Sequence, residues 1–327
     1  MRIAVTGSIA TDYLMTFPGK FAELIDADQL ERLSLSFLVD ELEVRRGGVA
    51  ANICFGMAQL GLRPALVGAT GHDFSDDYES WLQRHGVDTA SVHFSEDRHT
   101  ARFLCTTDQD EAQLASFYAG AMVEARDIEL GPIQARLGGL DIVVVSPNDP
   151  EAMLRHTEEA KARSIAVVAD PSQQLARLEG EQIRALVDGA AYFIANDYER
   201  SLCEKKTGWS ADEVLARVGV RVTTLGAKGC LIEQAGEAPV EVPAVVPDDG
   251  AHLEPTGVGD AFRAGFLTGR AWGLDLQRSA QTGAVLATRV LESVGTQEYR
   301  VDPPSFVARM ADAYGQDAAD EVAAHLR

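Results

Sequence analysis

The feature that most constrains the fold is a set of short, continuously apolar segments that are rich in β-branched residues. They cover residues 2–7, 65–68, 142–146, 165–170, 192–196 and 222–226. Apolar residues at successive positions are typical of strands that are covered on both faces of a sheet. Helical patterns lie between most of these segments. The sequence therefore predicts an α/β fold with a doubly wound, mostly parallel sheet flanked by helices.

Two of the predicted helices begin with clear signals. Asp149 precedes Pro150, which places an N-cap residue before a proline at the first helical position. Ser210 is followed three residues later by Glu213, which is the pattern of a capping box. With 327 residues the chain can bury a large core without disulfides or a structural metal.

Two other regions alternate between apolar and polar residues. Residues 33–39 alternate and are continued by Leu42 and Val44, whereas residues 100–107 alternate and are followed by a polar turn and residues 112–117. Alternation predicts antiparallel hairpins with one solvated face. We therefore expect a small, discontinuous β lid. The lid would comprise residues 12–48 and 94–120, and the α/β core residues 1–11, 49–93 and 121–327.

The charge balance and the apolar runs limit the possible partners. The chain has 29 basic and 50 acidic residues, a net charge of −21, so neither nucleic acid nor an anionic membrane is an expected partner. No apolar run approaches the ~20 residues of a membrane span. The first residues lead directly into a predicted strand without a signal-peptide cleavage pattern, and the four cysteines form no CxxC pair. These features favour a cytoplasmic protein with reduced thiols.

The carboxyl ends of the predicted strands carry polar residues and glycines. Ligands of open α/β sheets bind beyond these ends, although turn chemistry alone would favour the same residue types. Arg177 and Lys228 each follow such an end and are candidates for contact with a phosphate.

The segment 255–262 carries the clearest chemical signal. Two glycines at a helix start let the backbone N–H groups of Gly257, Val258 and Gly259 face an anion, and the helix dipole adds about half a positive charge there. Asp260 could accept a proton from a hydroxyl beside them, which contributes about 10²–10⁴-fold to a rate. The alternative is a glycine-rich turn with an ordinary helix-start aspartate. The chain has neither a Walker A loop nor a GxGxxG motif.

Four short motifs occur in order along the chain. They are Gly47-Gly48 with Asn52, Asn196 with Glu199, Thr224–Gly229, and Glu254–Asp260. Together they resemble the signatures of the ribokinase-like, phosphofructokinase-B type sugar and nucleoside kinases, over essentially the whole chain. Segments 8–12, 35–39 and 170–177 are most similar to the actinobacterial-type adenosine kinases of that family.

The resemblance implies a role for each matching residue. Asp260 would be the general base for the nucleoside 5′-hydroxyl, and the amides of Gly257, Val258 and Gly259 the anion hole. The nucleoside contacts implied are Ser8, Asp12, Ser36, Gly48, Asn52, Gln173 and Gln174. The residues implied for ATP are Asn196, Thr224, Gly226 and Gly229, with Glu199 acting on Mg²⁺ through water.

Three phenylalanines give a separate argument for a nucleoside. Phe37, Phe103 and Phe117 lie in the segments expected to form the lid. Stacking of a base on an aromatic ring contributes about 1–3 kcal/mol, whereas a bare sugar would need polar lid residues. The alternative is that these rings form the lid core or a dimer face.

The chain also departs from the family pattern. Glu254 and Pro255 replace the family's Asp and Thr in a region whose backbone helps to hold a monovalent cation, so dependence on K⁺ is left open. Ser172, Gln173 and Gln174 stand where many sugar kinases of the family carry Asn and Arg, which favours the nucleoside branch.

The resemblance therefore implies ATP-dependent phosphorylation of the 5′-hydroxyl of adenosine, with ATP and Mg²⁺ as cofactors and AMP and ADP as products. Two alternatives remain: a sugar kinase of the same family that acts on a ribose- or fructose-type acceptor, and a non-catalytic nucleoside-binding protein. The resemblance also implies a homodimer through the lids, which would cover the apolar face of residues 33–44.

Overall fold

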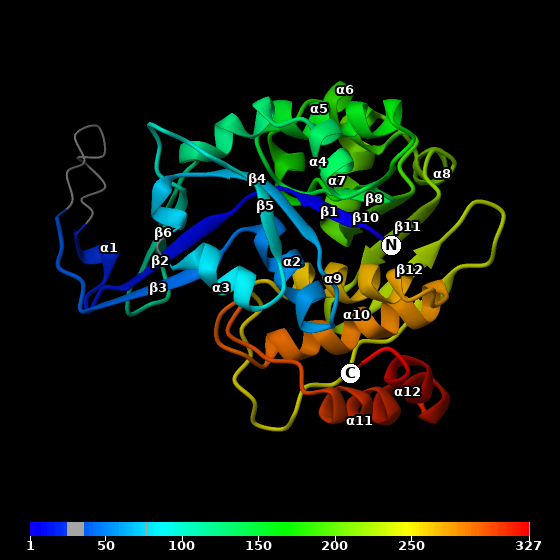
Figure 1. Cartoon of the computed structure of the whole chain (residues 1–327). Helices are drawn as coiled ribbons and strands as arrows, with labels where there is room; N and C mark the ends of the chain where they lie inside the picture. The colour runs from blue at the N-terminus through cyan, green and yellow to red at the C-terminus, as the bar shows by residue number, and fades with distance from the viewer. Residues whose placement is uncertain (25–35, 76, 327) are drawn as a thin grey trace.

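The computed structural model describes residues 1–24, 36–75 and 77–326. In this part of the chain, the main sheet has nine strands in the order β13-β12-β11-β10-β9-β8-β1-β4-β5 (Figure 1). The parallel strands are β1 (Ile3–Thr6), β4 (Ala65–Thr70), β5 (Asp88–Phe94), β8 (Ile142–Val145), β9 (Ala166–Ala169), β10 (Tyr192–Asn196) and β11 (Val220–Thr224). The antiparallel edge strands are β12 (Cys230–Glu233) and β13 (Val240–Val242). The predicted doubly wound, mostly parallel sheet is confirmed.

Helices cover both faces of this sheet (Figure 1). One group consists of α2 (Val49–Gln59), α9 (Val258–Ala271), α10 (Leu276–Leu291), α11 (Pro303–Tyr314) and α12 (Gln316–Ala323). The other consists of α4 (Leu130–Arg136), α5 (Pro150–Ala162), α6 (Gly180–Val187) and α7 (Asp197–Thr207). The shorter helices are α1 (Phe21–Leu24), α3 (Tyr78–Arg84) and α8 (Ala211–Leu215), with 3₁₀ turns at η2 (His72–Phe74), η3 (Gly120–Asp127), η4 (Ser172–Ala176) and η5 (Gly226–Lys228).

The two faces explain why a central strand such as β8 is apolar at every position. Val144 belongs to the core cluster on the α2–α9–α10 side, while its neighbours Val143 and Val145 belong to the cluster on the α4–α7 side. Successive strand residues point to opposite faces, so a strand between two helical layers needs an apolar residue at each step.

Both predicted helix starts are confirmed. The Asp149 carboxylate accepts hydrogen bonds from the backbone N–H groups of Glu151 and Ala152 at the start of α5. Ser210 and Glu213 form the expected capping box at the start of α8. None of the helices in the described ranges is long and apolar enough to cross a membrane.

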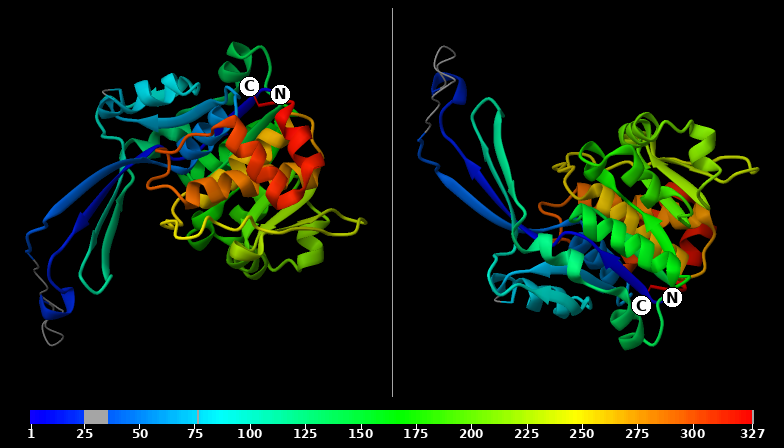
Figure 2. Two further views of the ribbon diagram at one scale, coloured as in Figure 1. Left: turned by 90° about the horizontal axis from the view of Figure 1, so that it is seen from below. Right: turned by 90° about the horizontal axis from the view of Figure 1, so that it is seen from above.

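A second sheet projects from the core as an arm (Figure 2). Its order is β3-β2-β6-β7, with β2 (Ala10–Thr16), β3 (Glu41–Gly47), β6 (Ala101–Thr107) and β7 (Gln113–Tyr118). The predicted hairpin over 100–107 and 112–117 is confirmed as the antiparallel pair β6–β7. The core and lid boundaries themselves stay a prediction.

The other predicted hairpin differs from the structure. Residues 36–39 have no regular secondary structure, so the strand predicted over 33–39 is wrong there, and residues 33–35 lie outside the described residues. The partner of β3 is β2, which the sequence analysis did not identify as a strand. Most of β2 is half-buried, because no helical layer covers this sheet, and its residues therefore lack the continuous apolar pattern.

Candidate functional site

The start of α9 lies where the resemblance placed the anion hole. Gly257 is the N-cap residue, and its φ of 77° is in the left-handed region that glycine tolerates. A Cβ at this position would lie 2.7 Å from the Thr296 Cγ2 atom. The N–H groups of Gly257 and Gly259 have no hydrogen-bond partner among the described residues, whereas Val258 N donates to Pro255 O at 3.3 Å. Two of the three predicted amides are therefore available to an anion.

Asp260 is held in place beside these amides. Asn52 Nδ2 on α2 donates to Asp260 Oδ2 at 2.9 Å. Asn52 Oδ1 in turn accepts from Gln297 Nε2 at 2.9 Å and lies 2.9 Å from Thr296 Oγ1. Gln297 Nε2 also donates to Tyr78 OH at 2.5 Å. The amide orientation of Asn52 is therefore fixed, and its N–H group faces the carboxylate.

The surroundings of Asp260 suit a general base. Burial raises the pKa of Asp260 to about 6, while the Arg263 guanidinium and the hydrogen bond from Asn52 act in the opposite direction. A carboxyl group with a pKa near 6 is ionised at neutral pH and is more basic than an ordinary aspartate. The carboxylate can therefore both orient a hydroxyl and accept its proton.

Sequence reasoning missed Arg263, a cation close to Asp260. Arg263, on the turn of α9 after Asp260, lies 2.6 Å from Asp170 Oδ1 at the end of β9. The same guanidinium lies 3.9 Å from Glu199 Oε2 at the start of α7. Burial raises the pKa of Asp170 to about 7, with Arg263 opposing the rise. No local pattern links residues 170, 199 and 263, since the fold alone brings them together.

One row of side chains across the second sheet faces the same site. Arg45 pairs in register with Asp12, Asp12 with Phe103, and Phe103 with Phe117. Residues paired in this way project from the same face of a sheet. Asp12 and Phe103 line a pocket of about 100 Å³ together with Thr256, Gly295 and Thr296, so they lie near the segment that leads into α9. Burial raises the pKa of Asp12 to about 6, against the opposing effect of Arg45.

Gly48 and Ser8 shape the backbone between β1 and α2. Gly48 has a φ of 95°, and a Cβ there would lie 2.6 Å from both Ser8 O and Ala10 N. Ser8 Oγ accepts a hydrogen bond from Val49 N at 3.0 Å, and Ala50 N donates to Ser8 O. Ser8 is therefore already committed to the start of α2, and the Gly48 position accepts only glycine.

The residues predicted for ATP lie at the ends of β10 and β11. Asn196 and Glu199 form the capping box that begins α7. Thr224 ends β11, and Gly226 (φ 60°) and Gly229 (φ 97°) form the following tight turn, closed by Leu225 N donating to Gly229 O. Lys228 is exposed in this turn. These positions lie at the carboxyl edge of the sheet, as the sequence predicted.

Glu199 fits contact with Mg²⁺ through water better than direct ligation. Its Oε2 accepts from Asn196 N at 2.8 Å, and its Oε1 accepts from Ser172 Oγ at 3.2 Å. The described residues contain no cluster of three acidic, histidine or cysteine side chains that could hold a metal by themselves. The divalent ion would therefore arrive with the nucleotide.

The side chain of Glu254 does not suit a K⁺ site. Its Oε1 accepts from Arg45 Nη1 at 2.7 Å, and its Oε2 from Gly295 N at 3.3 Å. The Arg45 guanidinium already supplies a positive charge to this carboxylate, so the Glu254 side chain is not free to hold a cation.

Five other predicted residues are not gathered around Asp260. Phe37 packs against Phe17 and Phe21, with ring centroids 4.9 and 5.3 Å away, and Ser36 is exposed in an irregular segment. Gln174 is buried, and its Nε2 donates to Asn148 O at 2.7 Å. Gln173 and Arg177 are exposed, on and just after η4. Their contacts with substrate stay predictions.

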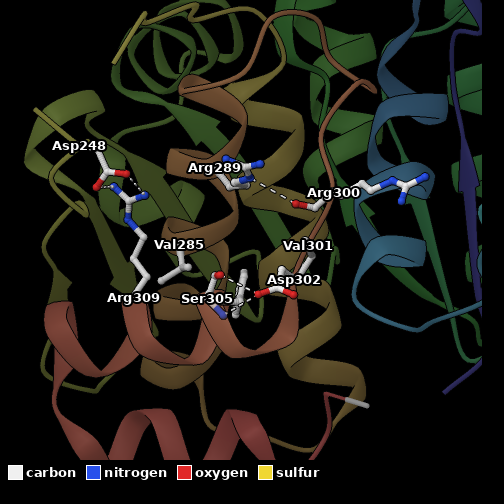
Figure 3. A pocket seen from close by; sticks show the side chains of 9 residues that line it. Asp248, Val285, Arg289, Arg300, Val301, Asp302, Ser305 and Arg309 are labelled. Atoms are coloured by element: carbon white, nitrogen blue, oxygen red, sulfur yellow. Dashed lines mark hydrogen bonds and ion pairs between the residues drawn. The ribbon is translucent and has the colours of Figure 1, made fainter. Parts of the chain in front are cut away.

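A second, larger cavity of about 270 Å³ lies between α10, α11 and the segment around Asp248 (Figure 3). Here Arg309 pairs with Asp248, and Asp302 accepts from Ser305 at the start of α11. None of the residues that line it was predicted as a site residue, and none of them lines the pocket beside Asp12 and Phe103.

Comparisons with known proteins identify similar sequences and structures. The family model of the pfkB family carbohydrate kinases matches residues 18–302. A nucleoside kinase from Methanocaldococcus jannaschii is 27% identical over 90% of this chain and 92% of its own length.

Two solved structures of Burkholderia thailandensis nucleoside kinase are also similar. The structure in complex with inosine is 31% identical, with a TM-score of 0.83, over 96% of this chain and 98% of its own. The structure with ADP-inosine is 32% identical, with a TM-score of 0.81, over 96% of each chain. The chain therefore belongs to the pfkB family of carbohydrate kinases, with the ribokinase-like fold, and is a phosphotransferase that acts on an alcohol acceptor.

Proposed function

We propose that this enzyme transfers the terminal phosphate of ATP to the 5′-hydroxyl of adenosine, giving AMP and ADP. One observation carries the proposal. The Asp260 carboxylate, oriented by Asn52, lies on the first turn of α9 with the amides of Gly257 and Gly259, which have no partner among the residues that the structure describes. The pocket lined by Asp12 and Phe103 also includes Thr256, directly before this turn.

In the proposed reaction, Asp260 accepts the proton of the 5′-hydroxyl as its oxygen forms a bond to the γ-phosphorus. The bond between that phosphorus and the β–γ bridging oxygen breaks, and ADP leaves. The amides of Gly257 and Gly259 stabilise the charge on the transferred group, which is the main contribution a protein makes to phosphoryl transfer. Mg²⁺ held through water by Glu199 would neutralise charge on the ATP phosphates. Thr224, Gly226, Lys228 and Gly229 would contact the nucleotide at the end of β11.

The second sheet supports a nucleoside rather than a bare sugar. The Arg45–Asp12–Phe103–Phe117 row places a carboxylate next to two aromatic rings. A carboxylate accepts hydrogen bonds from ribose hydroxyls, and an aromatic face stacks on a base. The inosine complex of the similar Burkholderia enzyme favours the same class of acceptor. Among the purine nucleosides, the segments that resemble adenosine kinases favour adenosine.

We also propose that the second sheet acts as a lid and joins two copies of the chain. Its strands expose apolar side chains, among them Leu42 and Val44 on β3 and Leu114 and Tyr118 on β7. A second copy would cover this surface. A cytoplasmic setting is proposed as well, supported by four buried cysteines that form no disulfide.

An ADP-release assay with adenosine, inosine, guanosine, ribose and fructose tests the acceptor. We expect the highest kcat/KM with adenosine, and near-complete loss of turnover in Asp260→Asn with nucleoside binding retained. A preference for ribose or fructose would establish the sugar-kinase alternative. No ADP formation with any acceptor would favour the non-catalytic alternative.

A further inference from the structure

The buried residue Arg263 has no role in the reaction described so far. It lies one helical turn after Asp260 on α9 and is 5% exposed. A Cβ added to Gly259 would lie 2.8 Å from Arg263 Nη1, so the guanidinium lies directly against the backbone of the anion hole. Its Nη2 lies 2.6 Å from Asp170 Oδ1 and 3.9 Å from Glu199 Oε2. One guanidinium therefore lies close to Gly259, to the end of β9 and to the first turn of α7.

The charges around Arg263 are unbalanced. Three carboxylates, those of Asp170, Glu199 and Asp260, surround the site, and each acts electrostatically on Arg263. Among the described residues, Arg263 is the single cation that acts electrostatically on Asp170 and Asp260. An incoming phosphoryl group is itself an anion, so three carboxylates would oppose its approach. A fixed positive charge next to Gly259 offsets that repulsion where the phosphate would bind.

The geometry also favours arginine over another cation. The planar guanidinium has several donors in a fixed arrangement, so it can contact Asp170 with one nitrogen and lie against Gly259 with another. A lysine carries its charge on a single nitrogen and cannot contact both at once.

We propose that Arg263 is a positioning residue for phosphoryl transfer, which supports the Gly259 side of the anion hole and ties it to Asp170 and Glu199. The proposal rests on the function assigned to Asp260 and the hole. The competing explanation is an ordinary buried ion pair between Arg263 and Asp170 that contributes only to folding.

A double-mutant comparison separates the two explanations. Arg263→Met and Asp170→Asn each leave an unpaired buried group, whereas the double variant removes both charges. We expect the double variant to regain most of the thermal stability that Arg263→Met loses. Its kcat should remain about 10²-fold below that of the wild type, the loss typical of a site misplaced by about 1 Å. Its KM for the acceptor should change less than about threefold, because the lost interaction acts on the transition state and not on binding of the acceptor.

Arg221 and Glu233 provide a matched control. This buried pair joins β11 to β12, with Arg221 Nε 2.9 Å from Glu233 Oε2, and it has no contact with Asp260. The Arg221→Met/Glu233→Gln variant should keep its stability and show a wild-type kcat. Arg263→Lys, which keeps the charge, gives a folded protein in which kcat should still fall.

Recovery of wild-type kcat together with stability in the double variant would overturn the proposal, as would wild-type kcat in Arg263→Lys. All rates are measured with whichever acceptor gives the highest wild-type turnover. A wrong choice of nucleoside therefore leaves this test valid, and wild-type activity in Asp260→Asn would contradict the proposed base separately.

Discussion

The hydrogen bond from Asn52 to Asp260 makes a quantitative prediction about pH. In Asn52→Ala, the charged form of Asp260 loses this 2.9 Å bond. Hydrogen bonds to charged groups contribute about 1.5–3 kcal/mol, and one pKa unit corresponds to about 1.4 kcal/mol. The pKa of Asp260 should therefore rise from about 6 to about 7–8. The base must be ionised, so the acid limb of the kcat/KM profile should move up by the same amount.

The expected loss depends on pH in a way that a general structural defect would not. At pH 7 the fraction of ionised base falls between about two- and tenfold, and at pH 9 the ratio of wild-type to variant activity should shrink towards the cost of any other lost contact. Steady-state kinetics from pH 5.5 to 9.5 measure the ratio of wild-type to variant activity at both pH values. Asp12→Asn is the necessary control, because burial also raises the pKa of Asp12 to about 6. A deficit in Asn52→Ala that is equal at all pH values would refute the reasoning.

Three further substitutions test the geometry of the site. Gly257→Ala should lower the free energy of unfolding by about 1–3 kcal/mol and reduce kcat, because it combines a strained φ with a Cβ 2.7 Å from Thr296. Gly250→Ala has the same φ of 77° but open space around it, so urea denaturation should show a smaller loss of stability. Phe103→Ala should raise KM for adenosine by at least about fivefold, the loss of one stacking contact, and leave ribose phosphorylation unchanged; an equal effect on both acceptors would contradict stacking. Arg45→Met should lower the free energy of unfolding by no more than about 1 kcal/mol, because its ion pair with Glu254 is partly exposed. Thermal melts should show the same effect for Glu254→Gln, and a much larger loss would show that the pair is more than a surface contact.

The sequence could predict the layers of the fold because the signal is local. A central strand such as β8 is covered by helices on both faces, so its residues are apolar at every position. Asp149 and Ser210 mark helix starts through their own side chains. The signal is absent in β2, which is half-buried on a sheet without a helical layer. The sequence analysis therefore paired the segment of β3 with residues 33–39, whereas the structure pairs β3 with β2.

The site was predictable where one segment carries the chemistry and not where the fold assembles it. Residues 257–260 combine glycines, a helix start and a carboxylate in four positions, and the amides of Gly257 and Gly259 remain unpartnered among the described residues. The contact of Asn52 with Asp260 joins residues 208 positions apart, and Arg263 meets Asp170 across 93 positions. The topology of the sheet brings such pairs together, and no sequence pattern marks them because the two residues lie so far apart in the chain.

The same contacts couple the second sheet to the catalytic segment. Thr296 Oγ1 lies 2.9 Å from both the Arg46 carbonyl on β3 and Asn52 Oδ1, while the Thr296 methyl group lies against Gly257. The neighbouring Arg45 on β3 binds Glu254, three residues before Gly257. A movement of β3 would therefore act on the orientation of the proposed base, through Asn52, and on the proposed anion hole, through Thr296 and Glu254. If the lid moves when the acceptor binds, the base and the hole must adjust together, which links exclusion of water to assembly of the site.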